Sequence, residues 1–203
     1  MKNNAEYTPA DNSLTGFASN VTGATWTLTA TSSGDGLAHQ VTIRNDTAND
    51  HSGKTATLVG TDPEGHALTE VLALPAGSAT TTSTAYFLTL TSITPSATIG
   101  ADTMDIGWND VAVTNAYPVN YRQGSFNIGV GVKVTGTISY TLQETYDDPW
   151  NIETMEWIAD ATMAAKTASS AVAIIIPCQA IRIKINSLTA GATIHIHYLQ
   201  GNP

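Results

Sequence analysis

The sequence predicts an all-β protein made of two β-sandwich or jelly-roll-like modules in tandem. Threonine is enriched in short runs with valine, isoleucine and leucine, which is the composition of strands. Turn signals separate these runs at intervals of about ten residues, a spacing typical of sandwiches and barrels. Helix-forming residues span a useful length only in Ile152–Lys166, where a loop with a short strand at Met155–Ala159 is the competing interpretation. We therefore expect at most one short helix.

Composition and charge exclude several classes of partner. Of 203 residues, 42% are hydrophobic, enough for a sizeable core, and only 12% are charged, about half of the usual roughly 25%. The net charge is −9 and the basic residues are scattered, which argues against nucleic acid. No apolar run is long enough to span a membrane. The polar N-terminus lacks the apolar core of a secretory signal, so we expect residues 1–20 to form a flexible arm.

The strands divide between a first module, residues 21–116, and a second, residues 117–203, because strand periodicity lapses near Asn109–Asn120. In the first module we expect strands at Thr25–Thr31, His39–Arg44, Thr55–Thr61, Ala67–Leu74, Tyr86–Ile93 and Thr103–Trp108. In the second we expect them at Ser125–Thr135, Thr137–Thr145, Ala171–Ile176, Ala180–Asn186 and Thr193–Leu199.

Turn chemistry predicts three hairpins. Pro63 suits the second position of a type I turn and Gly65 the positive φ that follows it. Gly136 and Gly191 mark the other two. In the second module, alternation predicts that a set of apolar residues points inward while Arg182 and Lys184 point out. The inward set is Ile138, Tyr140, Leu142, Ile181, Ile183 and Ile185.

The strand that begins at Phe126 has one face with almost no side chains. Its apolar residues alternate with Asn127, Gly129, Gly131 and Lys133. A strand glycine costs about 0.5–1 kcal/mol relative to alanine. Either a bulge with positive φ requires the two glycines, or a second backbone or a flat aromatic group packs closely on them. We hypothesise the contact, in which this face packs against another segment such as that of a neighbouring subunit.

The acidic residues suggest two kinds of site without completing either. They gather at Glu144, Asp147, Asp148, Glu153, Glu156 and Asp160. A glycosidase needs two carboxylates that face each other across a cleft, and a calcium site at "TYDDPW" needs more regular ligand spacing. A loop of solvated acids is the interpretation we favour. We expect folding to need no metal and no cofactor.

Other reactive residues have ordinary structural explanations. His195 and His197 lie two apart on a strand, so they share a face opposite Ile194, Ile196 and Tyr198. No third metal ligand is evident in that module, and we interpret them as an exposed pair. Cys178, the only cysteine, sits among apolar residues and is read as a buried hydrophobe.

The tryptophans suit either a core or a glycan platform. Trp26, Trp108, Trp150 and Trp157 would stack on sugars if they were exposed together, but a sandwich core or an interface more often takes up tryptophan. No nucleophile elbow, zinc-protease motif or phosphate loop occurs. The sequence therefore predicts no catalytic residues and no enzyme.

Two long segments resemble structural proteins of tailed bacteriophages. The run "TATLVGTDPEGHALTEVLALPAGSATTTSTAYFLTLTSIT" is similar to a pattern in which a GTD-x-x-G-x-x-x-TE hairpin precedes a threonine-rich loop and a closing strand. "FNIGVGVKVTGTISYTLQETYDDPW", with the later "IPCQAIRIKINSLTAGATIHIHYLQG", resembles a β-sandwich module often fused behind the first. The resemblance covers roughly Thr55 to Gly201 and departs at Cys178, where an aliphatic or small residue is expected.

This resemblance implies a virion protein assembled in the host cytoplasm, most plainly a capsid decoration (cement) protein without enzymatic activity. The implied partners are the major capsid protein or other virion proteins. A tail or head-fibre component that contacts host-surface glycan is the alternative. The low surface charge predicts a homo-oligomer, a trimer ahead of a dimer. We expect the interface to include Asn127, Gly129, Gly131, Lys133, Asp147, Asp148 and Trp150.

Overall fold

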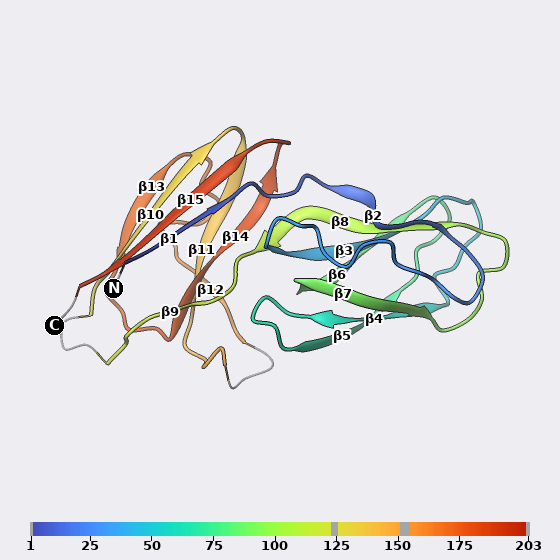
Figure 1. The fold of residues 1–203 in the computed structure, drawn as a ribbon, viewed down its shortest axis with the longest axis horizontal. Helices are drawn as coiled ribbons and strands as arrows, with labels where there is room; N and C mark the ends of the chain where they lie inside the picture. Colours follow the sequence, from blue (N-terminus) through green and yellow to red (C-terminus); the bar gives the residue numbers. More distant parts are fainter. Residues whose placement is uncertain (1, 123–125, 151–154, 202–203) are drawn as a thin grey trace. The chain divides into compact units, whose positions relative to one another are not determined.

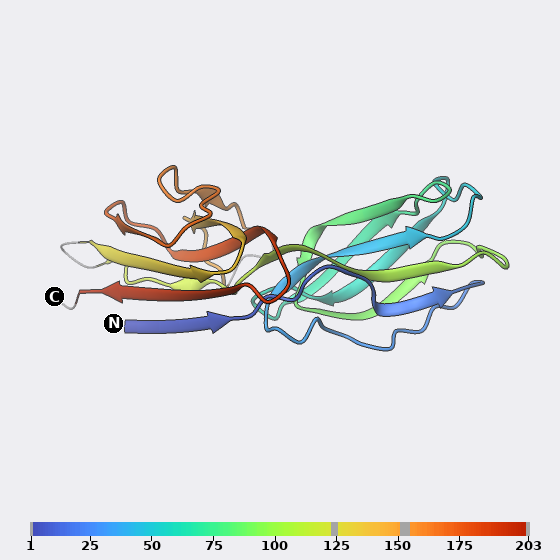
Figure 2. The same cartoon turned by 90° about the horizontal axis from the view of Figure 1, so that it is seen from above.

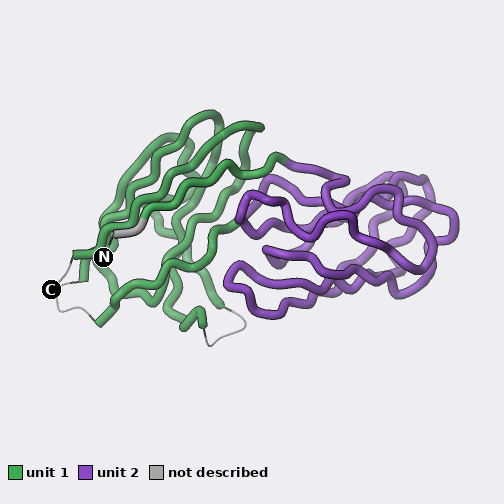
Figure 3. Tube along the Cα trace, viewed as in Figure 1, with its two compact units in different colours: residues 1–11, 113–203 green, residues 12–112 purple. Residues whose placement is uncertain are grey.

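The computed structural model describes residues 2–122, 126–150 and 155–201, and this part of the chain is all-β (Figure 1). The predicted fold class is confirmed, and no helix that could cross a membrane is found in the described residues. The chain divides into two compact units (Figure 3): unit 1 is Met1–Asp11 with Val113–Pro203, and unit 2 is Asn12–Ala112.

Unit 2 holds two antiparallel arrangements of strands. Its strands are β2 (Ser13–Val21), β3 (Ala38–Asn45), β4 (Thr55–Thr61), β5 (Ala67–Ala73), β6 (Thr80–Phe87), β7 (Thr89–Pro95) and β8 (Met104–Val113), whose last residue belongs to unit 1. One layer has the order β2-β8-β3-β6 and the other β5-β4-β7. Alternate residues of these strands form its core, where Phe17 packs edge-on against Trp108 with ring centroids 5.0 Å apart.

Unit 1 is a sandwich-like pair of sheets. Its strands are β1 (Lys2–Tyr7), β9 (Tyr117–Pro118), β10 (Ile128–Thr135), β11 (Ile138–Thr145), β12 (Ile158–Ala159), β13 (Ser170–Ile174), β14 (Ala180–Leu188) and β15 (Thr193–Gln200). The first sheet has the order β1-β15-β10-β13, and the second β12-β11-β14, with β9 also paired to β14.

The core of unit 1 follows the predicted alternation. All six residues expected to point inward are almost fully buried: Ile138, Tyr140, Leu142, Ile181, Ile183 and Ile185. From the opposite sheet, β10 and β15 contribute buried valines and isoleucines. The prediction that Arg182 points out to solvent is wrong, because its side chain is only 7% exposed. Its guanidinium lies 4.0 Å from the centre of the Trp157 ring, and its Nε donates to Gln143.

The predicted flexible N-terminal arm is wrong. β1 pairs in antiparallel register with β15 along its whole length (Figure 2), and β2 pairs with β8. Lysine, asparagine and glutamate are poor strand formers, so pairing with a well-formed neighbour, rather than local propensity, makes these residues strands. The N-terminus thus supplies an edge strand to unit 1.

Several local predictions also need correction. Thr25–Thr31 forms no strand; Thr29 instead donates its backbone N–H to Phe17 O at 2.8 Å. The single strand expected at Tyr86–Ile93 is broken at Leu88 into β6 and β7, which belong to different sheets. The threonine-rich segment before Tyr86 is β6, not a loop.

One of the three predicted hairpins is confirmed. The turn at Pro63–Gly65 joins the paired strands β4 and β5, and Asp62 accepts the N–H groups of Glu64 and His66. Gly136 and Gly191 have the expected positive φ, 80° and 79°. However, each turn connects strands of different sheets, so neither makes a hairpin.

The candidate helix is not formed in its described part. Its first residues, Ile152–Thr154, and Ser125 of another predicted strand lie outside the described residues. From Met155 the chain forms irregular structure, β12 and turns, which agrees with the competing interpretation of a loop with a short strand.

Candidate docking surface

The outward face of the β1-β15-β10-β13 sheet contains the nearly bare strand face. Strand register sets Gly129 between Leu199 of β15 and Ala173 of β13. One step along, Gly131 lies between His197 and Ala171. The two glycines therefore form the floor of a strip that is one strand wide. We call this strip the glycine groove, and its lining residues are Gly129, Val130, Gly131, Ala171, Val172, His197 and Leu199.

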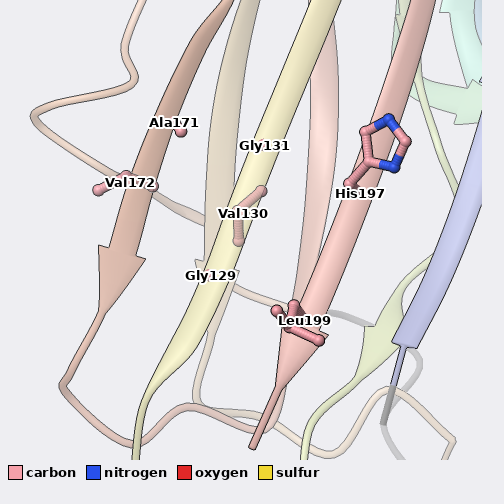
Figure 4. A pocket seen from close by; sticks show the side chains of 7 residues that line it. All are labelled: Gly129, Val130, Gly131, Ala171, Val172, His197 and Leu199. Atoms are coloured by element: carbon pink, nitrogen blue, oxygen red, sulfur yellow. The ribbon is translucent and has the colours of Figure 1, made fainter.

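The groove is shallow, open and lined almost entirely by carbon atoms. Figure 4 shows His197 and Leu199 on β15 beside the part of β10 that carries Gly129, Val130 and Gly131. The hollow has a volume of about 220 Å³. Leu199 is 60% exposed, although an exposed leucine alone is unremarkable in a soluble protein. Together these features give an apolar depression that can receive a side chain or a backbone segment from outside.

Backbone geometry does not require the two glycines. β10 pairs with β13 and with β15 without any shift in register, and neither glycine has a positive φ. A Cβ atom at Gly129 would lie 3.7 Å from Leu199 O, and one at Gly131 would lie 3.9 Å from the Cβ of His197. Both are ordinary contacts, so alanine would fit. The explanation by a bulge is therefore wrong, and nothing within the described chain crowds these positions.

Polar residues border the groove. Asn127 and Lys133 are exposed at its two ends on the β10 side. His197 Nδ1 is 2.9 Å from Asn4 Oδ1, and His195 Nε2 is 2.9 Å from Glu6 Oε1, so β1 engages both histidines. The predicted shared face of the histidine pair is confirmed by the burial of the residues that alternate with them. An apolar floor with a polar rim is the usual anatomy of a protein interface.

The other predicted interface residues lie elsewhere. Asp147, Asp148 and Trp150 follow β11, a strand of the opposite sheet. Asp147 Oδ2 accepts the N–H of Glu156 at 2.8 Å, and Asp148 Oδ1 accepts that of Trp150 at 3.0 Å. These carboxylates therefore fix the local loop. No contact among the described residues joins this loop to the glycine groove.

The described part of the chain gathers no set of three or more potential metal ligands. Glu153 of the acidic cluster lies outside the described residues. Glu144 and Asp160 do meet, and burial, followed by the charge of Asp160, raises the pKa of Glu144. Sequence reasoning missed this pair because the two residues are brought together by strand pairing and not by spacing.

Cysteine and tryptophan take the predicted structural roles. Cys178 is buried, and loss of solvation raises the pKa of its thiol to about 12. Trp26 and Trp108 are in the core of unit 2. The Trp157 ring is covered by the guanidinium group of Arg182. Trp150 is the most exposed of the four tryptophans, at 51%. The four rings do not gather into a platform.

The chain matches no protein-family model and no curated protein. Its function must therefore be inferred from its own residues and geometry.

Proposed function

We propose that this protein is a structural component of a tailed-bacteriophage virion, a capsid decoration protein that binds and stabilises the head shell through the glycine groove. The observation that carries the proposal is a regular, unbulged strand whose outward glycines have no use inside the chain. Each glycine costs about 0.5–1 kcal/mol in a strand interior. A contact with another molecule explains why the side chains are missing.

The organisation of the chain supports a structural role in the virion. Both segments that resemble phage structural proteins fall on regular all-β architecture, the first mostly in unit 2 and the second in unit 1. The surface has few charges for its size, which suits a protein that is held in an assembly. The protein works as a homo-oligomer, most simply a trimer, on a shell built by symmetry.

The chemistry of the described residues favours binding over catalysis. The three histidines of unit 2 are each engaged with aspartate: His39 with Asp35 at 2.8 Å, His51 with Asp102 at 2.8 Å and His66 with Asp62 at 3.1 Å. His51 Nδ1 also accepts a hydrogen bond from Lys54. These pairs tie neighbouring loops together, and a structural role accounts for them.

A tail or head-fibre component that contacts host glycan is a second candidate, on a separate observation. Tyr146 and Trp150 are both about half exposed on the loop that follows β11, next to Asp147 and Asp148. An exposed aromatic ring beside carboxylates is suited to stacking on a sugar and accepting its hydroxyl groups.

Binding of the purified protein to its two candidate targets separates these functions. Fluorescently labelled protein is mixed with phage shells that lack it, and separately with glycans of the host envelope. A decoration protein is expected to sediment with the shells and to show no binding to the glycans. Binding to glycans alone would overturn the proposal in favour of the fibre role, and release of reducing ends from the glycans would indicate a hydrolase.

Light scattering tests the proposed oligomer. A mass well above the 21.3 kDa of a single chain is expected. The single-chain mass at every concentration would contradict it.

A further inference from the structure

Three large isoleucines are exposed near one another in unit 1. Ile174 ends β13 and is buried, but Ile175 and Ile176, which follow it, are 69% and 62% exposed. Ile158 of β12 is 56% exposed. A single exposed isoleucine is normal, whereas a group of them indicates an interaction surface or a liability for aggregation.

These isoleucines surround one pair of carboxyl groups. Ile175 and Ile176 line a hollow of about 110 Å³ together with Glu144 and Asp160. Ile158 is the direct partner of Glu144 in the β11–β12 ladder. Glu144 is therefore the common neighbour of all three exposed isoleucines. We call these five residues the isoleucine–carboxyl patch.

The two carboxyl groups of the patch lie close enough to influence each other. Asp160 Oδ1 accepts the N–H groups of Thr162 and Met163, each at 2.8 Å, which fixes its position beside Glu144. The Glu144 side chain lies next to that of Asp160, and both line the hollow together with Ile175 and Ile176. Burial, followed by the charge of Asp160, raises the pKa of Glu144, so Glu144 binds a proton more readily than an exposed glutamate does.

No cation balances this pair from within its own stretch of chain. The chain has no lysine or arginine between Lys133 and Lys166. Arg182, on the neighbouring strand, is stacked on Trp157 and bonded to Gln143. The other titratable groups that interact with Glu144 are Tyr146 and Cys178, both weak acids.

We propose that the isoleucine–carboxyl patch is a docking site for a segment of another protein that carries apolar side chains next to lysine or arginine. Charge complementarity identifies this occupant: the patch joins exposed apolar area to two acids that form no ion pair with a base among the described residues. A second copy that docks through the same patch fits less well, because it brings the same acids and no lysine or arginine between Lys133 and Lys166. The site is separate from the glycine groove and does not depend on the proposed function.

Docking of a base at this patch is linked to proton release. Where Glu144 is protonated, the incoming ammonium or guanidinium group displaces that proton, after which both carboxylates pair with the cation. Below the pKa of Glu144 in the free protein, each binding event therefore releases a proton. Affinity rises with pH until Glu144 is already ionised before binding.

Calorimetry with a short peptide of alternating leucine and lysine tests the proposal. The wild-type protein is expected to bind it, and to bind a leucine–glutamine peptide at least tenfold more weakly. Ile175→Ser with Ile176→Ser should weaken binding of the lysine peptide at least tenfold. Glu144→Gln should abolish the proton release, which is measured by comparing buffers of different ionisation enthalpy.

A matched control removes charge and apolar area elsewhere. Asp50→Asn with Val71→Ser changes an exposed acid and a 62% exposed valine in unit 2, and should leave binding unchanged. Absence of binding to the wild type, or equal loss in the control and patch variants, would overturn the proposal. Self-association of the wild type that disappears in the Ile175→Ser, Ile176→Ser variant would show that a second copy is the occupant instead.

Discussion

Glycines in the strands of unit 2 and unit 1 stand in opposite environments. In unit 2, a Cβ at Gly107 of β8 would overlap the carbonyl oxygen of Ser13, and one at Gly60 of β4 would overlap that of Thr89. Irregular register accompanies both positions. In unit 1, Gly129 and Gly131 lie in a regular ladder with room for a side chain.

This difference separates two reasons for a strand glycine. Close approach of another backbone explains Gly60 and Gly107 from within the chain. Nothing within the described chain explains Gly129 and Gly131, so their explanation is sought in a partner. The same residue type in the same alternating pattern thus has an internal explanation in unit 2 and, in our proposal, an external one in unit 1.

The largest effect is expected from filling an internal contact. Gly107→Ala should destabilise the protein by roughly 3 kcal/mol, the upper end of the range for overpacking, because the backbone at Ser13 must move. Chemical denaturation measures this free energy of unfolding. An unchanged midpoint would show that unit 2 is not closely packed at this glycine.

Filling the external face should have the opposite sign. Gly129→Ala with Gly131→Ala should stabilise the protein, by about 0.5–1 kcal/mol at each site, because alanine restricts the unfolded chain and meets only ordinary contacts. The same denaturation experiment applies. Destabilisation would mean that these glycines serve the fold, and the comparison between the units would fail.

The carboxyl pair of unit 1 should also reduce stability in the isolated protein. Folding raises the pKa of Glu144, so the folded state binds the proton more tightly than the unfolded state does. Stability is therefore greatest below the ordinary glutamate pKa of about 4.3 and falls as pH rises toward the raised value. Glu144→Gln should raise the melting temperature at neutral pH and have little effect below pH 4. A melting temperature that falls equally at both pH values would argue against a raised pKa of Glu144.

The smallest effect concerns the segment that leads from the exposed Ile175 and Ile176 into the core. Cys178 is buried with a thiol pKa of about 12. A disulfide reagent at mildly alkaline pH should leave it unmodified in the folded protein and react fully after unfolding. Rapid reaction in the folded state would show that this segment opens readily.

Alternation and turn chemistry predict much of unit 1 because its strands are buried on one face. The inward isoleucines of β14 and the histidine face of β15 are of this kind. β1 and β2 could not be predicted from local sequence, because β1 is a strand through its pairing with β15 and β2 through its pairing with β8. The turns at Gly136 and Gly191 are predictable, but local chemistry does not reveal that each crosses between sheets.

The candidate sites, like the fold, can be predicted only in part from the sequence. The bare face of β10 can be predicted from the sequence, because strand periodicity alone determines which residues share it. The residues that flank this face cannot be predicted in this way, because only the strand register places Leu199 beside Gly129 and Ala171 beside Gly131. The meeting of Glu144 with Asp160 likewise depends on the β11–β12 pairing.

Binding of a groove-filled variant to phage shells tests the central claim most directly. Gly129→Val with Gly131→Val fills the glycine groove, and valine suits a strand. Ala67→Val with Ala73→Val adds the same bulk to exposed positions of β5 in unit 2 and serves as the matched control. Circular dichroism and thermal melting first establish that both variants fold. We predict that the groove variant sediments with shells at least tenfold more weakly than wild type, while the control binds normally. A folded groove variant that binds shells as tightly as wild type would contradict the account.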